Sequence, residues 1–178
     1  FAPVCALCAV SISDIPLLPA YTELFMGKAA VYFKSFFPVF MLGAVFGKGM
    51  EESGLARSIA RAIIRGLGPE RAIVSVVLAC AVLTYGGVSL FVVVFAVYPF
   101  AASLFRQANI PKRLLPGSIA LGAFTFTMDA LPGTPQIQNL IPMPYFKTTA
   151  FAAPGLGILG GLLIFLLGML WLHQRARR

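Results

Sequence analysis

Residues that commonly perform catalysis or bind metal ions are scarce in this sequence. Its 178 residues include six aspartates and glutamates, one histidine and three cysteines. An enzyme embedded in a membrane needs a nucleophile with a base, paired acids or a set of metal ligands. His173 lies among arginines, and the remaining residues assemble no triad or metal cluster. The sequence therefore predicts no enzyme, no cofactor and no metal site.

Cysteine pairs with redox or zinc-binding spacing are almost absent too. Cys5 and Cys8 form a CxxC motif, but the chain has no second pair and no histidine near it. All three cysteines lie in apolar stretches, where we interpret them as small apolar helix residues.

Charged side chains make up only 11% of the chain, whereas 59% of the residues are hydrophobic. A soluble domain of this size would need more polar surface. The net charge is +8, but the basic residues form short clusters between apolar spans, which argues against a nucleic-acid partner. The positive-inside rule explains the same clusters, Lys48 among them. We therefore expect an all-α integral membrane protein, a polytopic helical bundle that forms one domain over residues 1–178.

The longest uncharged run extends from Ala72 to Phe105, with Gly86 and Gly87 near its middle. A straight helix of this length would measure about 50 Å, well over the ~30 Å hydrocarbon core of a bilayer. Two full crossings of roughly 20 residues each, with a turn, would need a longer run. The run therefore predicts a re-entrant hairpin over residues 72–105 that breaks at the glycines. Irregular backbone at such depth is tolerated where it lines a watery cavity, which indicates transport.

Two further apolar spans precede the hairpin. Residues 1–10 are typical of the end of a crossing, and a polar loop after Ser11 is placed outside. A crossing over residues 29–48 follows, with Gly43 and Gly47 at GxxxG spacing, which we interpret as helix-packing residues.

Between this crossing and the hairpin, residues 51–67 predict an amphipathic helix that lies in the headgroup plane. Its apolar face is expected to consist of Leu55, Ile59 and Ile63. Its arginines, expected to face anionic lipid, are Arg57, Arg61 and Arg65.

A second long span, residues 114–146, contains no lysine or arginine. It is helical in composition as far as Met128, but residues 131–135 cannot continue a helix. Residues 136–141 can complete the crossing, so this span predicts a broken transmembrane helix. The last crossing, residues 152–172, ends in basic residues and therefore in the cytoplasm. Its glycines at packing distance are Gly157 and Gly161.

Both breaks supply helix starts at membrane depth. Ser89 can cap the helix after the two glycines, and Thr134 is suited as an N-cap with Pro135 as the first helical residue. A helix start carries about half a positive charge and free N–H donors, which suit a carboxylate. The nearby polar residues expected to help hold a hydroxylated organic anion are Thr84, Ser89, Thr134, Gln136 and Asn139.

Asp129 is the acid expected within the membrane. Such a residue is costly there and by default suggests a function. Its protonation could be coupled to anion binding, which makes it the proton-coupling candidate. The alternative is that it caps or hydrogen-bonds the loosened backbone.

Three motifs resemble the gluconate:proton symporter (GntP) family within the wider ion transporter superfamily. They are LTYGGVSLFVV at residues 83–93, TFTM at 125–128 and PGTPQIQNLIP at 132–142. The resemblance implies a re-entrant hairpin and a broken helix in each of two inverted repeats, with this chain as the first. It implies that the hairpin tip consists of Gly86, Gly87, Val88 and Ser89. It implies that the unwound turn contacting the substrate includes Gly133, Thr134, Pro135 and Asn139.

Sodium-coupled members of the wider superfamily carry Ser-Asn-Thr at the hairpin tip, and the different tip here favours protons. The resemblance therefore implies proton-coupled symport of gluconate or a similar anion in the bacterial cytoplasmic (inner) membrane. Two alternatives stay open: a transporter for another carboxylate, of the citrate or dicarboxylate type, or a noncatalytic membrane assembly subunit. The expected partners are the anion, protons, the lipid bilayer and the missing C-terminal repeat, and a homodimer is compatible with the sequence.

Overall fold

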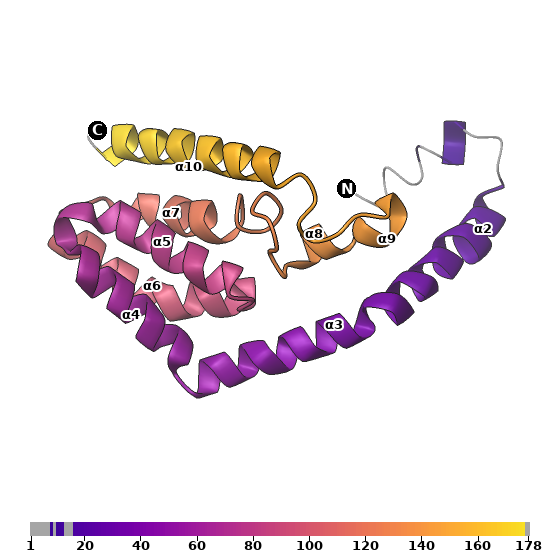
Figure 1. Cartoon of the computed structure of the whole chain (residues 1–178), viewed down its shortest axis with the longest axis horizontal. Helices are drawn as coiled ribbons and strands as arrows, with labels where there is room; N and C mark the ends of the chain where they lie inside the picture. The colour runs from indigo at the N-terminus through magenta and orange to yellow at the C-terminus, as the bar shows by residue number, and fades with distance from the viewer. Residues whose placement is uncertain (1–7, 9, 13–15, 177–178) are drawn as a thin grey trace. The chain divides into compact units, whose positions relative to one another are not determined.

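The structure, a computed structural model, describes residue 8, residues 10–12 and residues 16–176, and every regular element within them is a helix (Figure 1). This confirms the prediction of an all-helical chain. Most of the expected partial crossing over residues 1–10, Cys5 included, lies outside the described residues. The chain divides into two compact units, residues 1–42 and residues 43–178, which are described separately.

The first unit contains a continuous apolar helical segment. Helix α2 (Leu17–Pro19), the π-helical turn η1 (Ala20–Phe25) and helix α3 (Met26–Glu52), which extends into the second unit, follow one another without a loop. The outer loop predicted after Ser11 is therefore wrong where α2 and η1 lie. Proline is tolerated in the first turn of a helix because the N–H groups there have no intrahelical acceptor. Pro19 consequently lies in the first turn of the helical segment without interrupting it.

The second unit is a helical bundle. Its elements after α3 are α4 (Leu55–Leu67), η2 (Pro69–Arg71), α5 (Ala72–Tyr85), α6 (Leu90–Gln107), η3 (Lys112–Leu114), α7 (Leu115–Ala123), α8 (Ile137–Leu140), α9 (Met143–Phe146) and α10 (Pro154–Ala176). Helices α4 to α7 pack together, and α10 packs against α5 and α7 (Figure 1). The core consists mainly of small and β-branched side chains, with Phe105 as the largest that is fully buried.

The uncharged run forms two helices that are separated where the sequence predicts a break. Helix α5 ends at Tyr85, α6 begins at Leu90, and the two pack against each other. The interruption needs glycine, because Gly87 has a φ of +86°, a conformation that other residues rarely adopt. With 14 residues, α5 is about 21 Å long and too short to cross a ~30 Å hydrocarbon core.

Helix α4 has its arginines exposed as predicted, but its buried face differs from the prediction. The buried residues are Ala56, Ala60 and Ile64, whereas the predicted Ile59 and Ile63 are half-buried against the core and Leu55 is exposed. This face packs against α5 and α6 instead of being free to enter lipid. Alanine allows neighbouring helices to approach closely. A prediction from hydrophobic periodicity instead favours the larger apolar residues as the buried face.

The second long span is interrupted in the structure, but α7 ends at Ala123, well before the predicted Met128. The hydroxyl groups of Thr125 and Thr127 donate hydrogen bonds to the carbonyl oxygens of Leu121 and Gly122, over 2.7 and 2.8 Å. Such bonds compete with the helical ladder. Turns then continue to the short helix α8.

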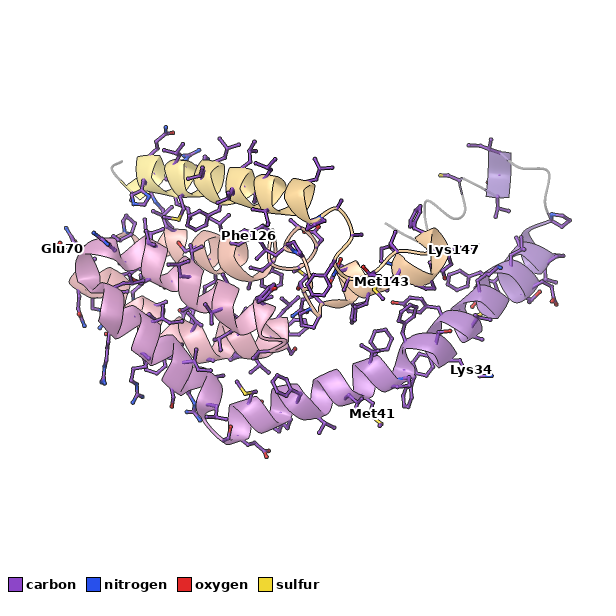
Figure 2. All side chains as sticks on the ribbon, viewed as in Figure 1. Lys34, Met41, Glu70, Phe126, Met143 and Lys147 are labelled. Atoms are coloured by element: carbon purple, nitrogen blue, oxygen red, sulfur yellow. The ribbon has the colours of Figure 1, made fainter. Side chains whose placement is uncertain are left out.

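Helix α10 is confirmed over the predicted crossing and runs antiparallel to α7. A Cβ atom on Gly117 would lie 3.4 Å from Leu172 Cδ2, whereas one on Gly161 would lie 3.3 Å from Leu131 Cδ2. The Phe126 and Phe165 rings meet edge to face, with centroids 5.8 Å apart, and Phe126 is labelled in Figure 2. The α10 glycines therefore bring this helix against the break that follows α7, as predicted for packing residues.

We expect Gly157→Ala to destabilise the protein by about 1 to 2 kcal/mol, because the added methyl group would overlap the carbonyl oxygen of Ala130. Ala130 lies in a turn that can partly adjust. In the matched control Gly160→Ala, the methyl group enters open space on the same helix. Thermal unfolding of the whole protein in detergent measures the difference. Equal melting temperatures for the two variants would contradict this packing.

The helix ends of the second unit differ in charge. Elements η2 and η3 contact the adjoining ends of α4 to α7 and α10, which gathers five lysines and arginines at one end of the unit, here called the basic end. These residues are Arg71, Arg106, Lys112, Arg113 and Arg175. Figure 2 shows Glu70 at the basic end and Lys147 away from it. Both helix breaks lie away from the basic end, since α5 and α7 both start there.

Three helices among the described residues are long and apolar enough to cross a membrane. They are Ala20–Glu52, Leu90–Gln107 and Pro154–Ala176.

Candidate functional site

The two helix breaks meet in space. The side-chain amide of Gln136 donates a hydrogen bond from Nε2 to the carbonyl oxygen of Thr84, over 2.8 Å. The hydroxyl group of Tyr85 donates to the carbonyl oxygen of Pro132, also over 2.8 Å. A Cβ atom on Gly87 would lie 3.4 Å from Pro135 Cγ. The structure thus brings together the two segments that the sequence predicts to share a site.

The backbone of the hairpin tip is largely occupied by its own hydrogen bonds. The amide groups of Gly86, Gly87 and Val88 donate to the carbonyl oxygens of Val82, Thr84 and Leu83 respectively. The Val88 side chain is buried in the core. These three residues shape the tip, and their amide groups are not free donors.

Free donors are instead expected at the start of α6. Ser89 is the N-cap residue, as predicted, but its hydroxyl group makes no capping hydrogen bond. The amide groups of the first helical turn have no intrahelical acceptor, and the helix dipole places a partial positive charge there. This 18-residue helix therefore presents a start suited to an anion.

The predicted cap of the second helix is wrong. The Thr134 hydroxyl group donates to the carbonyl oxygen of Thr127 over 2.7 Å, and Gln136 is the N-cap residue of α8. Thr134 is fully buried, so its hydroxyl group must find a partner in the protein, and the turns after α7 provide the Thr127 carbonyl group. Helix α8 has four residues and Pro135 precedes it, so its dipole is weaker than the sequence suggests.

Asn139 holds the broken helix to the segment that returns toward α10. Its Nδ2 atom donates to the carbonyl oxygens of Thr134 and Ala150, over 3.0 and 3.1 Å. The amide group of Gly133 donates to the same Ala150 oxygen over 2.8 Å. A Cβ atom on Gly133 would lie 2.6 Å from the ring of Phe151, so that ring covers the glycine. We name residues 148–152 the strap.

The strap is bounded by two residues with unusual backbone conformations. Lys147 has a φ of +51° and Ala153 a φ of +47°. Both values lie in the left-handed region, which is unfavourable for residues with a Cβ atom.

Two further polar groups lie near the breaks. Thr84 is fully buried, and its hydroxyl oxygen has no hydrogen-bond partner among the described residues. Asp129 is exposed in the turns after α7. Within the described part of the chain, no group of histidine, cysteine and acidic residues could hold a metal ion.

Sequence reasoning missed the contribution of α3. A Cβ atom on Gly47 would lie 3.3 Å from Ser89 Cβ, and one on Gly87 would lie 3.9 Å from the Phe46 ring. The GxxxG spacing indicates that Gly47 packs against something, but not that its neighbour is the hairpin tip. Gly43 has open space around it.

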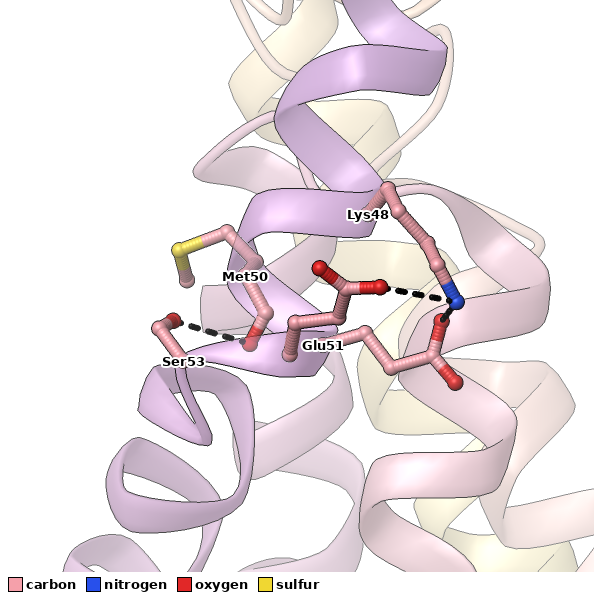
Figure 3. Close-up of polar contacts among 5 residues, drawn as sticks. Lys48, Met50, Glu51 and Ser53 are labelled. Carbon is pink, nitrogen blue, oxygen red and sulfur yellow. Dashed lines mark hydrogen bonds and ion pairs between the residues drawn. The ribbon is translucent and has the colours of Figure 1, made fainter.

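A charged cluster directly follows this contact. The Lys48 ammonium group lies 3.5 Å from a carboxylate oxygen of Glu51 and 3.5 Å from one of Glu52 (Figure 3). Lys48 therefore lies near the hairpin tip and not at the basic end, which differs from the expectation that it belongs to the cytoplasmic clusters. All three side chains are exposed.

Comparison with known proteins identifies the family. The model of the GntP family permease matches residues 34–169. A protein of Bacillus subtilis (strain 168) named "Uncharacterized transporter YxjC" is 60% identical over 179 residues, an alignment that covers all of this chain and 38% of the relative. No solved structure matches the chain. The match to most of the chain, with the two helix breaks where the motifs lie, shows that this chain belongs to the GntP family of permeases, which are transporters.

Proposed function

We propose that this chain is one repeat of a secondary active transporter that carries a small hydroxylated organic anion, such as gluconate, together with protons. The observation that carries the proposal is the meeting of the two breaks, joined by the Gln136–Thr84 and Tyr85–Pro132 hydrogen bonds. Interrupted helices whose ends converge on one place are the usual construction of a substrate site in secondary transporters.

Helix α10 provides a measure of the depth of this site. Its 23 residues correspond to about 34 Å, enough to cross a hydrocarbon core of ~30 Å. Phe126, just after the end of α7, contacts Phe165 near the middle of α10. Gly157 packs on Ala130, about 5 Å along the axis from the start of α10. These contacts support a second break that extends from near mid-depth toward the side opposite the basic end, and a hairpin that enters from the cytoplasm.

The charged cluster beside the tip supports a watery surface there. The side chains of Lys48, Glu51 and Glu52 are at least half exposed, at 61%, 50% and 69% of their surface. Charged groups at membrane depth face cavities or partners, because hydrocarbon solvates them poorly. Irregular backbone beside such a cavity keeps access to hydrogen-bonding solvent or substrate.

The chemistry of the site suits a carboxylate with hydroxyl groups. The start of α6 offers partial positive charge and amide donors, and Ser89 and Gln136 offer small polar groups. Asp129 is the group that we assign to proton coupling, since it is exposed near the break and ionisable. The chain spans 38% of the length of the relative it matches, and we propose that a second, inverted repeat completes the site in a multi-pass protein of the cytoplasmic membrane.

The test is uptake of labelled gluconate into proteoliposomes that contain the whole protein, with an imposed pH gradient and competing acids. We expect gradient-driven uptake that falls at least about tenfold in Thr134→Ala, Asn139→Ala, because both side chains hold the broken helix in place. The matched control is Gln138→Ala, Thr148→Ala, which changes two exposed residues of the same region.

Three outcomes would contradict parts of the proposal. Uptake of another carboxylate but not of gluconate would reject the substrate. Uptake driven by sodium but not by protons would reject the coupling. Absence of uptake of any organic anion under either gradient would reject the transporter for this class of substrate.

A further inference from the structure

We propose that the arginine row of α4, defined as Arg57, Arg61 and Arg65, binds the headgroups of anionic phospholipids. The three residues repeat every four positions and are all exposed. Their Cα atoms therefore follow one flank of the helix over about 12 Å, with a shift of roughly 40° between neighbours. The inference concerns the membrane and does not depend on which substrate is carried.

The charges of the arginine row are not neutralised by the described part of the chain. Helix α4 contains no acidic residue. The ion pairs among the described residues join Lys48 to Glu51 and Glu52, so these two carboxylates are already paired. A row of three unpaired guanidinium groups is complementary to phosphate groups, which arginine binds through two parallel hydrogen bonds.

The apolar face of α4 is already occupied by protein, which distinguishes this helix from one that inserts into lipid by itself. Ala56, Ala60 and Ile64 are buried against α5 and α6. The arginine row is therefore not simply the back of an inserted amphipathic helix. It is a polar flank whose place is fixed by the bundle.

A neighbouring surface indicates where the acyl chains lie. The guanidinium group of Arg61 stacks over the ring of Phe100 on α6, 5.0 Å from its centroid. The same helix exposes Phe91 and Phe95 at 73% each, together with Tyr98 at 53%. Such an aromatic face on an apolar helix is suited to hydrocarbon, with tyrosine near the headgroups. Arg61 thus contacts α6, the helix whose exposed aromatic side is suited to the bilayer. This favours a lipid headgroup over an acidic protein as the partner of the arginine row.

The experiment uses the whole protein in phosphatidylcholine vesicles that contain spin-labelled phosphatidylglycerol or spin-labelled phosphatidylcholine. Electron paramagnetic resonance gives the relative association of each lipid with the protein. We expect a preference for phosphatidylglycerol that falls at least about tenfold in Arg57→Gln, Arg61→Gln, Arg65→Gln, since each basic residue near an anionic surface contributes about fivefold. The matched control, Lys28→Gln, Lys34→Gln, Lys147→Gln, removes three positive charges elsewhere and should keep the preference within about twofold.

Two further measurements keep the test decisive if the triple variant does not fold. The single variants Arg57→Gln and Arg65→Gln leave the Arg61–Phe100 contact intact and should each weaken the preference several-fold. In the unmodified protein, 0.5 M salt should reduce it, because the Debye length shortens to a few ångströms. An unmodified protein without the preference, or equal losses in the arginine variants and the lysine control, would overturn the proposal.

Discussion

Gly122→Ala should force α5 and α7 apart and destabilise the whole protein by about 3 kcal/mol or more. A Cβ atom at this position would overlap the carbonyl oxygen of Val77 and lie 2.6 Å from Cys80 Cβ. Both neighbours belong to the middle of α5, where the backbone is fixed by its helical hydrogen bonds. Overpacking of a well-packed core typically costs about 1 to 3 kcal/mol, and contact with a rigid backbone places this site at the upper end.

The measurement is thermal unfolding in detergent, with the amount of folded protein followed by size-exclusion chromatography. Gly66→Ala on α4 is the control, because a methyl group there would meet nothing within 4 Å. Its melting temperature should stay close to that of the unmodified protein. If Gly122→Ala and Gly66→Ala have the same melting temperature, the close approach of α5 and α7 is wrong.

Gln136→Met should reduce uptake at least about fivefold while leaving most of the protein folded. The change keeps the length of the side chain but removes the donor to the Thr84 carbonyl oxygen, which joins the two breaks. A hydrogen bond of this kind contributes about 1 kcal/mol or more to a conformation, and a difference of 1.4 kcal/mol is tenfold in an equilibrium. The expected loss therefore appears as weaker substrate binding, because the two halves of the site are no longer held in register.

Gln138→Met provides a nearly identical chemical change two residues away. Gln138 is exposed and lies on the same short helix. We expect its uptake and apparent affinity to match those of the unmodified protein, measured in the same proteoliposome assay. Equal defects in the two variants would show that the Gln136–Thr84 bond has no special part in the site.

The hairpin break and the last crossing could be predicted from the sequence because each has a single physical solution. A long uncharged run that is too long for one crossing and too short for two must be interrupted, and the paired glycines mark the place. The crossing that forms α10 is equally constrained, since it is apolar and ends at basic residues. The convergence of the two breaks followed from the same reasoning about helix starts.

Other features depend on competition between contacts that the sequence pattern does not reveal. Helix α7 stops early because the hydroxyl groups of Thr125 and Thr127 bind its carbonyl oxygens. Thr134 serves as a buried donor to Thr127 instead of a helix cap. The prediction for α4 missed the centre of its buried face, because alanines mark a close helix contact whereas hydrophobic periodicity is dominated by leucine and isoleucine. In each case the outcome depends on a neighbour that only the folded chain supplies.

The backbone conformations at the two ends of the strap hold it under strain. Lys147 and Ala153 both hold positive φ angles without being glycine, and each position stores roughly 1 to 2 kcal/mol of strain. That strain opposes the hydrogen bonds from Gly133 and Asn139 to Ala150. Release of the strap relieves this strain, which partly offsets the cost of breaking those hydrogen bonds. The turn at Gly133 should therefore open more readily than the number of its hydrogen bonds alone would predict. Faster hydrogen exchange at the Gly133 amide than at the amide groups of α5 would report this opening.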